Sequence, residues 1–238
     1  MRSDTTPAPE RDLAAIWEAT IERIEGLLRS LPDDSETQPL HTVPGATVCD
    51  GVAHLAQVLA TPEPVPLTLP EPGTAQSALP ELIADVHAAA VALRSRLADC
   101  AVPALVTAIT MTEHDLRTVL NAPGARDNVA IKVALDELSG RFSDRVAAAG
   151  LPSLRVTVEQ WGTIAGRGKA TSCVVADRFE FVRAMAGRRS AAEIGRWNWG
   201  VDPQIYLPVI AEVPLPVNEI RERDPRIPAH MKDREFAL

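Results

Sequence analysis

Four segments in the first half of the chain repeat their apolar residues at the spacing of an amphipathic helix. They cover residues 10–31, a stretch from Thr47 to the residue before Pro62, about 79–100 and about 103–120. Each has one apolar face, which a helix buries only by packing against other helices. The connections after the first and second segments are long. The pattern therefore predicts a four-helix bundle.

The pattern changes after the break at residues 121–124 (NAPG). From there the sequence predicts a helix over 128–149, strands over 154–159 and 170–176, and helices over 178–186 and 190–197,. We therefore expect an α+β fold that is mostly helical. The predicted parts are a helical bundle over 1–125, a small α/β domain over 126–220 and a flexible charged tail over 221–238.

Composition narrows the environment and the partners of the chain. None of its 238 residues lie in a run of ~20 apolar residues, the length that spans a bilayer,. The polar N-terminus does not resemble a secretory signal, so we expect a cytoplasmic protein without a membrane partner,. A net charge of −8 opposes binding to nucleic acid,. The three cysteines are far apart, which indicates neither a zinc knuckle nor a disulfide scaffold,.

Three motifs occur in order along the chain. They are residues 44–55 (PGATVCDGVAHL), residues 113–117 (EHDLR) followed by 123–127 (PGARD), and residues 179–190 (FEFVRAMAGRRS). Together they resemble the mycothiol-dependent maleylpyruvate isomerase family, whose fold is a DinB-like four-helix bundle followed by an α/β domain. The first motif departs from the family at Ala46, where a tryptophan is common.

The resemblance implies two cofactors: a divalent metal, such as zinc, and mycothiol, whose thiolate the metal activates. The family's metal ligands are a histidine on the second helix, and a glutamate and a histidine four residues apart on the fourth. The first position falls on His54, but the other two fall on Ala108 and Thr112. Alanine cannot bind a metal and neutral threonine is a poor ligand. The sequence therefore suggests that the metal has been lost.

Neighbouring residues offer weak substitutes for the missing ligands. His114 lies about 200° round the helix from Thr112 and is expected to point away from His54. Glu113 is expected to approach only from the rim. His87, beside the apolar Val86, is the candidate for reaching inward, with a structural or surface role as the alternative. His54 itself is either a ligand or a hydrogen-bonded core histidine, and two imidazoles alone make a weak metal site.

Three arginines are candidate ligand-binding residues. An inward Arg117 can hold a carboxylate through two hydrogen bonds, and the alternative is that Arg117 and Arg126 pair with Asp115 and Asp127. Arg188 and Arg189 precede a helix start, where guanidinium and backbone N–H groups can bind an anion,. A solvated turn is the alternative there. Trp161, Trp197 and Trp199 are expected to pack in the core or between domains. No catalytic residue is identified.

Three functions are compatible with these residues, and whether the chain is an enzyme stays open. The first is a maleylpyruvate isomerase-like protein with a degenerate metal site that binds a small ligand in the bundle cleft. The second is a mycothiol-dependent isomerase or thiol transferase with an altered metal site around His54. The third is a non-catalytic structural subunit that forms a homodimer through a helix face. Because Ala108 and Thr112 replace two of the metal ligands, they favour the first and third functions over the second.

Overall fold

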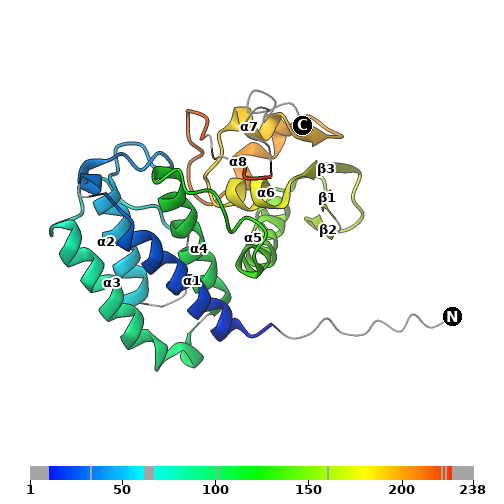
Figure 1. Cartoon of the computed structure of the whole chain (residues 1–238). Helices are drawn as coiled ribbons and strands as arrows, with labels where there is room; N and C mark the ends of the chain where they lie inside the picture. The colour runs from blue at the N-terminus through cyan, green and yellow to red at the C-terminus, as the bar shows by residue number, and fades with distance from the viewer. Residues whose placement is uncertain are drawn as a thin grey trace.

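The computed structural model describes residues 11–32, 34–61, 67–100, 102–159, 161–220, 222 and 224–226. Within these residues the fold is α+β and mostly helical, as predicted (Figure 1). The predicted tail over 221–238 lies mostly outside the described residues. None of the helices in the described part is both long and apolar enough to cross a bilayer.

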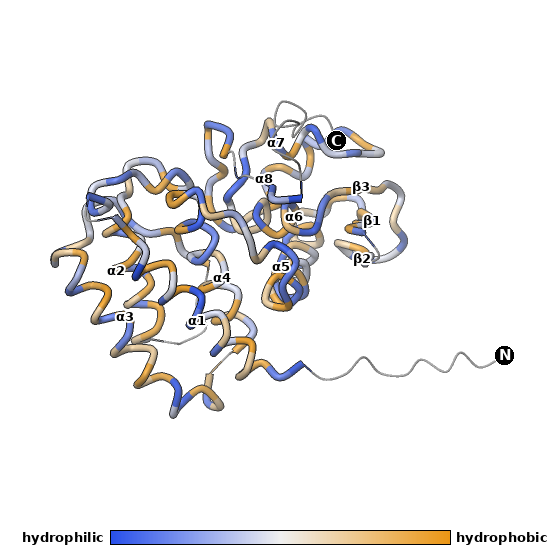
Figure 2. Tube along the Cα trace, in the orientation of Figure 1, coloured by the Kyte–Doolittle hydropathy of each residue, from blue (hydrophilic) through white to orange (hydrophobic). Residues whose placement is uncertain are grey.

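The first four long helices pack around one hydrophobic core. They are α1 (Leu13–Arg29), α2 (Val48–Ala60), α3 (Leu79–Arg94) and α4 (Val102–Val119). α1 lies along α4 and α2 lies along α3. Hydrophobic and hydrophilic residues alternate along each helix at the spacing of its turns, so each has an apolar stripe to bury (Figure 2),. The four predicted helices are confirmed, but a likeness to the DinB bundle stays a prediction.

The start of α2 is fixed by a reciprocal cap between Thr47 and Asp50, a threonine and an acid three residues apart,. The Thr47 hydroxyl accepts a hydrogen bond from the Asp50 backbone N–H at 3.3 Å. The Asp50 carboxylate accepts one from the Thr47 N–H at 2.9 Å and a second from the Ala75 N–H at 3.1 Å,. Asp50 thereby ties the loop before α3 to the helix that carries His54.

The second half of the chain forms a small mixed sheet with helices. Its elements are α5 (Val129–Ala148), β1 (Leu154–Val158), β2 (Trp161–Ala165), β3 (Ser172–Ala176), α6 (Arg178–Met185), α7 (Ala191–Gly195), β4 (Asn198–Trp199) and α8 (Leu207–Ile210). The strand order is β2-β1-β3-β4, with β1 parallel to β3 and the outer pairs antiparallel. The sequence predicts β1 and β3 but not β2 and β4.

α5 joins the two halves. Its Ala130 and Val133 belong to the core of the first four helices, whereas Phe142 and Val146 belong to the core beneath the sheet. Met111 of α4 also packs in that second core. The two cores therefore meet along α4 and α5, close to the predicted domain boundary at residues 125 and 126. The division into domains stays a prediction.

Candidate functional site

His54 lies in a very small pocket between α2 and α4. Thr112, Asp115 and Leu116 line this pocket from α4, so Thr112 does face His54. The pocket has a volume of about 10 Å³, room for about one water molecule. Burial lowers the pKa of His54, and the positive charge of Arg188 lowers that pKa further. The half-buried imidazole is therefore held in its neutral form.

The side chains around His54 do not fit a divalent metal. Asp115 is the one carboxylate among the described residues that lines the pocket, and both of its oxygens are engaged. Oδ1 accepts a hydrogen bond from Arg183 Nη2 at 2.7 Å, and Oδ2 accepts one from Arg188 Nη2 at 3.3 Å. A cation would have to displace both guanidinium groups. Across the described residues, no three His, Cys, Asp or Glu side chains come together in a metal-binding arrangement.

His87 does not reach inward, and of the two roles considered for it, the surface role is the one that it has. Its side chain is 67% exposed, and Nδ1 lies 2.8 Å from Glu25 Oε1 on α1. Val86 is buried in the core instead, and the next residue along α3 is turned by about 100° toward the solvent,. His87 therefore does not line the pocket of His54.

The residues beside Thr112 on α4 also have partners of their own. Glu113 is fully buried, and its carboxylate binds Arg23 of α1 at 2.9 Å and Arg117 at 2.8 Å. Arg117 thus pairs with the residue four positions earlier, which shares its helix face. The alternative pairing of Arg117 with Asp115 is wrong. His114 lines a different cavity from His54, as the helix geometry predicts.

A buried network of ion pairs connects α4, α6 and the C-terminal segment, whose described residues are 220, 222 and 224–226. Its centre is Arg183 of α6, a fully buried side chain that binds Asp115 of α4 and, through Nε at 2.8 Å, Glu222. Arg189 Nη1 also binds Glu222, at 3.1 Å, and Arg189 Nε binds Glu180. Glu222 belongs to the segment predicted to be a flexible tail, yet it is buried in this network.

The alternative of a solvated turn at Arg188 and Arg189 is wrong, because each residue is only 2% exposed. Gly187 has a φ of 73°, which ends α6 and turns the chain so that both guanidinium groups enter the protein,. Buried guanidinium groups require nearby counter-charges. Asp115, Glu180 and Glu222 supply them, so carboxylates of the chain itself take the place of an external anion here.

The electrostatics of the network favour its charged form. Burial lowers the pKa of Arg189, but Glu180 and Glu222 outweigh this effect and raise it above its usual value. Burial likewise opposes ionisation of Glu222, yet Arg183 and Arg189 hold the pKa of this carboxyl well below its usual range. Both partners are therefore charged at neutral pH.

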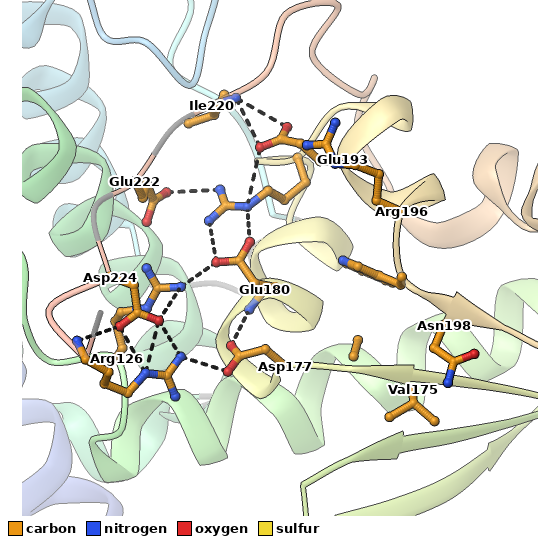
Figure 3. A pocket seen from close by; sticks show the side chains of 14 residues that line it. Arg126, Val175, Asp177, Glu180, Glu193, Arg196, Asn198, Ile220, Glu222 and Asp224 are labelled. Carbon is orange, nitrogen blue, oxygen red and sulfur yellow. Dashed lines mark hydrogen bonds and ion pairs between the residues drawn. The ribbon is translucent and has the colours of Figure 1, made fainter. Parts of the chain in front are cut away.

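A cavity of about 370 Å³ lies beside the network (Figure 3). Charged side chains from α6, α7 and the C-terminal segment, among them Glu180 and Glu222, lie on one side of it. Val175 at the end of β3 and Asn198 of β4 lie on the other. Trp197 also lines the cavity, in addition to its predicted packing role against Phe181 and Trp199.

Sequence reasoning missed this cavity because its walls come from four separate stretches of chain. The loop before α5 contributes Arg126, which binds Glu180. The predicted alternative, a pair between Arg126 and Asp127, is therefore wrong. The other walls are the end of β3, the region from α6 to β4, and residues 220, 222, 224 and 226. The Arg188-Arg189 pair in the third motif was the one local signal near it.

Comparison with protein-family models finds no match for this chain, and comparisons with curated proteins and with solved structures find no significant match. The resemblance to the maleylpyruvate isomerase motifs therefore stays a prediction.

Proposed function

We propose that this chain is a maleylpyruvate isomerase-like protein that binds a small molecule in the cavity of about 370 Å³ beside the ion-pair network. Cavities of roughly 300–1,000 Å³ are typical of small-molecule sites. The pocket beside His54, in the bundle cleft, has about 10 Å³ and admits no such ligand. The size of the larger cavity is the observation that carries the proposal.

The polar wall of the cavity supports binding because it is already ordered. Arg189 is fixed by Glu180 and Glu222, and Arg226 is fixed by Asp177 at 2.9 Å and Asp224 at 2.7 Å. A ligand that meets pre-positioned groups loses less binding energy to the ordering of side chains.

The charges of the cavity indicate the class of ligand. Five carboxylates and four guanidinium groups line it among the described residues, so an anion is disfavoured. Asp177 and Glu180 keep 29% and 27% of their side-chain surface exposed, and can accept further hydrogen bonds,. Trp197 and Ile220 add an apolar surface. An uncharged polyhydroxylated molecule satisfies both walls, with hydroxyl groups on the carboxylates and a ring face on the indole.

Mycothiol, which the resemblance implies, has a polyhydroxylated body of this kind. We therefore propose that the cavity binds mycothiol or a related sugar-inositol compound through that body. The proposal does not require a metal. The alternative of a metal-assisted isomerase around His54 is not favoured, because Asp115 is committed to Arg183 and Arg188.

Isothermal titration calorimetry with mycothiol, and with its thiol-free N-acetylglucosaminyl-inositol body, in which the nitrogen stays an uncharged amide, tests the proposal. Both are expected to give saturable binding, because the thiol is not the group recognised. Trp197→Ala is expected to weaken binding about tenfold, as removal of a central aromatic contact does. Trp161→Ala is the matched control, since Trp161 does not line the cavity. Absence of binding, or equal affinity in Trp197→Ala, would refute the proposal.

A further inference from the structure

A second, smaller cavity of about 40 Å³ lies between the end of α4, the loop before α5 and the start of α6. His114 of α4, Arg126 of the loop and Phe179 of α6 line it, and the exposed Asn121 stands at its edge. His114 and Arg126 come from the second family-like motif, and the cavity described above does not explain why they converge. The volume admits about three water molecules, or one carboxylate or phosphate group.

Two buried side chains of this cavity have nitrogens without a hydrogen-bond partner. Arg126 is 6% exposed, and its Nη2 binds Glu180, but its Nε and Nη1 bind nothing in the described structure. His114 is 2% exposed, and its Nε2 likewise has no partner. Buried polar groups are nearly always paired, so the two Arg126 nitrogens require an acceptor from outside the described chain, and His114 Nε2 requires one in the tautomer in which it carries the proton.

Phe179 holds both side chains in place. The Arg126 guanidinium lies over the ring at 4.1 Å from its centroid, and the His114 ring meets it edge-on with centroids 4.6 Å apart,. The unpaired nitrogens are therefore presented in fixed positions, which favours binding of a ligand over rearrangement of the side chains.

The charges around the cavity favour an anion. Arg117 and Arg126 line it, and within the part of the chain that the structure describes Glu222 is the one carboxylate that does. Glu222 is already neutralised by Arg183 and Arg189. Arg117 is likewise paired with Glu113, and Arg126 with Glu180 through Nη2, so the guanidinium nitrogens left for an oxyanion are Nε and Nη1 of Arg126.

We propose that this cavity binds a small oxyanion, either a free phosphate or a carboxylate, whose oxygens accept hydrogen bonds from Arg126 Nε, Arg126 Nη1 and the Nε2–H tautomer of His114. The site does not depend on the proposed function. Arg126 and Glu222 line both cavities, but His114 and Asn121 line this one alone, and Trp197 lines the other alone.

The experiment follows the Arg126 Nε–H resonance by NMR while sodium phosphate or sodium formate is added to the full chain at constant ionic strength. A saturable shift with one or both salts, absent with sodium chloride, is the expected result. The two arms distinguish phosphate from carboxylate. His114→Phe keeps a ring against Phe179 but removes Nε2, so it is expected to weaken binding about tenfold. His87→Phe makes the same change on the surface and is expected to leave the affinity unchanged.

Asn121→Asp gives a second test that does not disturb the interior. Residue 121 is exposed and has a φ of 46°, a conformation that aspartate tolerates,. A negative charge at the edge of the cavity is expected to weaken binding severalfold. An Arg126 resonance that moves equally with chloride, or does not move, would overturn the proposal, whether or not His114→Phe folds. Loss of mycothiol binding with a retained phosphate shift would overturn the proposed function alone.

Discussion

Arg183 of α6 donates a hydrogen bond to Asp115 of α4 at 2.7 Å, with both side chains almost completely buried. The pair joins the helix that lines the His54 pocket to the helix that lines the larger cavity. Arg183 also occupies Oδ1 of Asp115, a carboxylate oxygen in the His54 pocket that could otherwise bind a metal ion. One contact thus fixes the two halves to each other and removes Asp115 from other chemistry.

Loss of Arg183 is expected to be strongly destabilising. Arg183→Ala leaves Asp115 and Glu222 buried without their main counter-charge, and removal of one partner from a buried ion pair costs about 3–5 kcal/mol. Urea unfolding of the variant measures the change in the free energy of unfolding. Arg94→Ala removes an arginine from an exposed pair with Glu18 and should leave the Tm nearly unchanged,. Equal effects of the two substitutions would contradict the buried network.

The purified chain is expected to contain far less than one zinc per molecule. His54 has neither of the two family-like ligands on α4, and Arg188 places a positive charge near it. Elemental analysis after dialysis measures the metal content, and the double variant Ala108→Glu, Thr112→His supplies the absent ligands as a positive control. Stoichiometric zinc in the unmodified chain that disappears in His54→Ala would show that the metal site is intact.

Acidification is expected to lower stability in two stages. Burial holds the pKa of His114 well below its usual value, so this imidazole is neutral in the folded chain. An unfolded histidine binds a proton below a pH of about 6.5. The contribution of His114 to the free energy of unfolding is therefore fully present above that pH and declines as the pH falls below it. Burial also lowers the pKa of His54, which contributes to the same stage.

The second stage belongs to Glu222. Arg183 and Arg189 outweigh burial and hold the pKa of Glu222 well below its usual range. Its contribution is present above the unfolded pKa of about 4.3 and is lost as the pH falls through the folded value. Urea unfolding from pH 7.5 down to about 2.5 should show the first stage and most of the second. His114→Phe should reduce the upper stage and Glu222→Gln should reduce the lower one, while an unchanged profile in both variants would refute the assignment.

Substitution of Gly187 by alanine is expected to lower stability more than the same substitution at a glycine with an equal backbone conformation. Gly187 and Gly73 both have a φ of 73°, where a side chain is strained,. A Cβ at Gly187 would lie 2.2 Å from Val213 Cγ2, whereas a Cβ at Gly73 meets nothing within 4 Å. Gly73→Ala therefore measures the backbone cost, about 1 kcal/mol. Gly187→Ala should cost a further 1–3 kcal/mol or so by overpacking, and equal Tm changes would contradict this.

The elements with strong local signals could be predicted from the sequence. Apolar periodicity predicts α1 to α5, alternation predicts β1, and the strand-like run of residues 170–176 (ATSCVVA) predicts β3. Thr47 with Asp50 and Ser190 with Glu193 have the spacing of a capping box in the sequence, and both form reciprocal caps in the structure,. β2 was missed because Gly162 lies within it and Gly166 directly follows it, and β4 because it has only two residues.

The ion-pair network could not be predicted because its partners are distant in sequence. Asp115 and Arg183 are separated by 68 residues, and Arg183 and Glu222 by 39. A charged residue carries no periodic signal that distinguishes a solvated turn from a buried pair. Arg188 and Arg189 were therefore candidates for an anion, but their partners and the cavity beside them depend on how the chain folds back on itself.

The position of Glu222 has a consequence for synthesis of the chain on the ribosome. Arg189 is translated 33 residues before the carboxylate that completes its counter-charge. A nascent chain that has reached only α8 therefore already contains Arg183 and Arg189 but not Glu222. The interior of the second half can close fully only after the segment beyond residue 220 has emerged, so its final folding step follows translation of that segment.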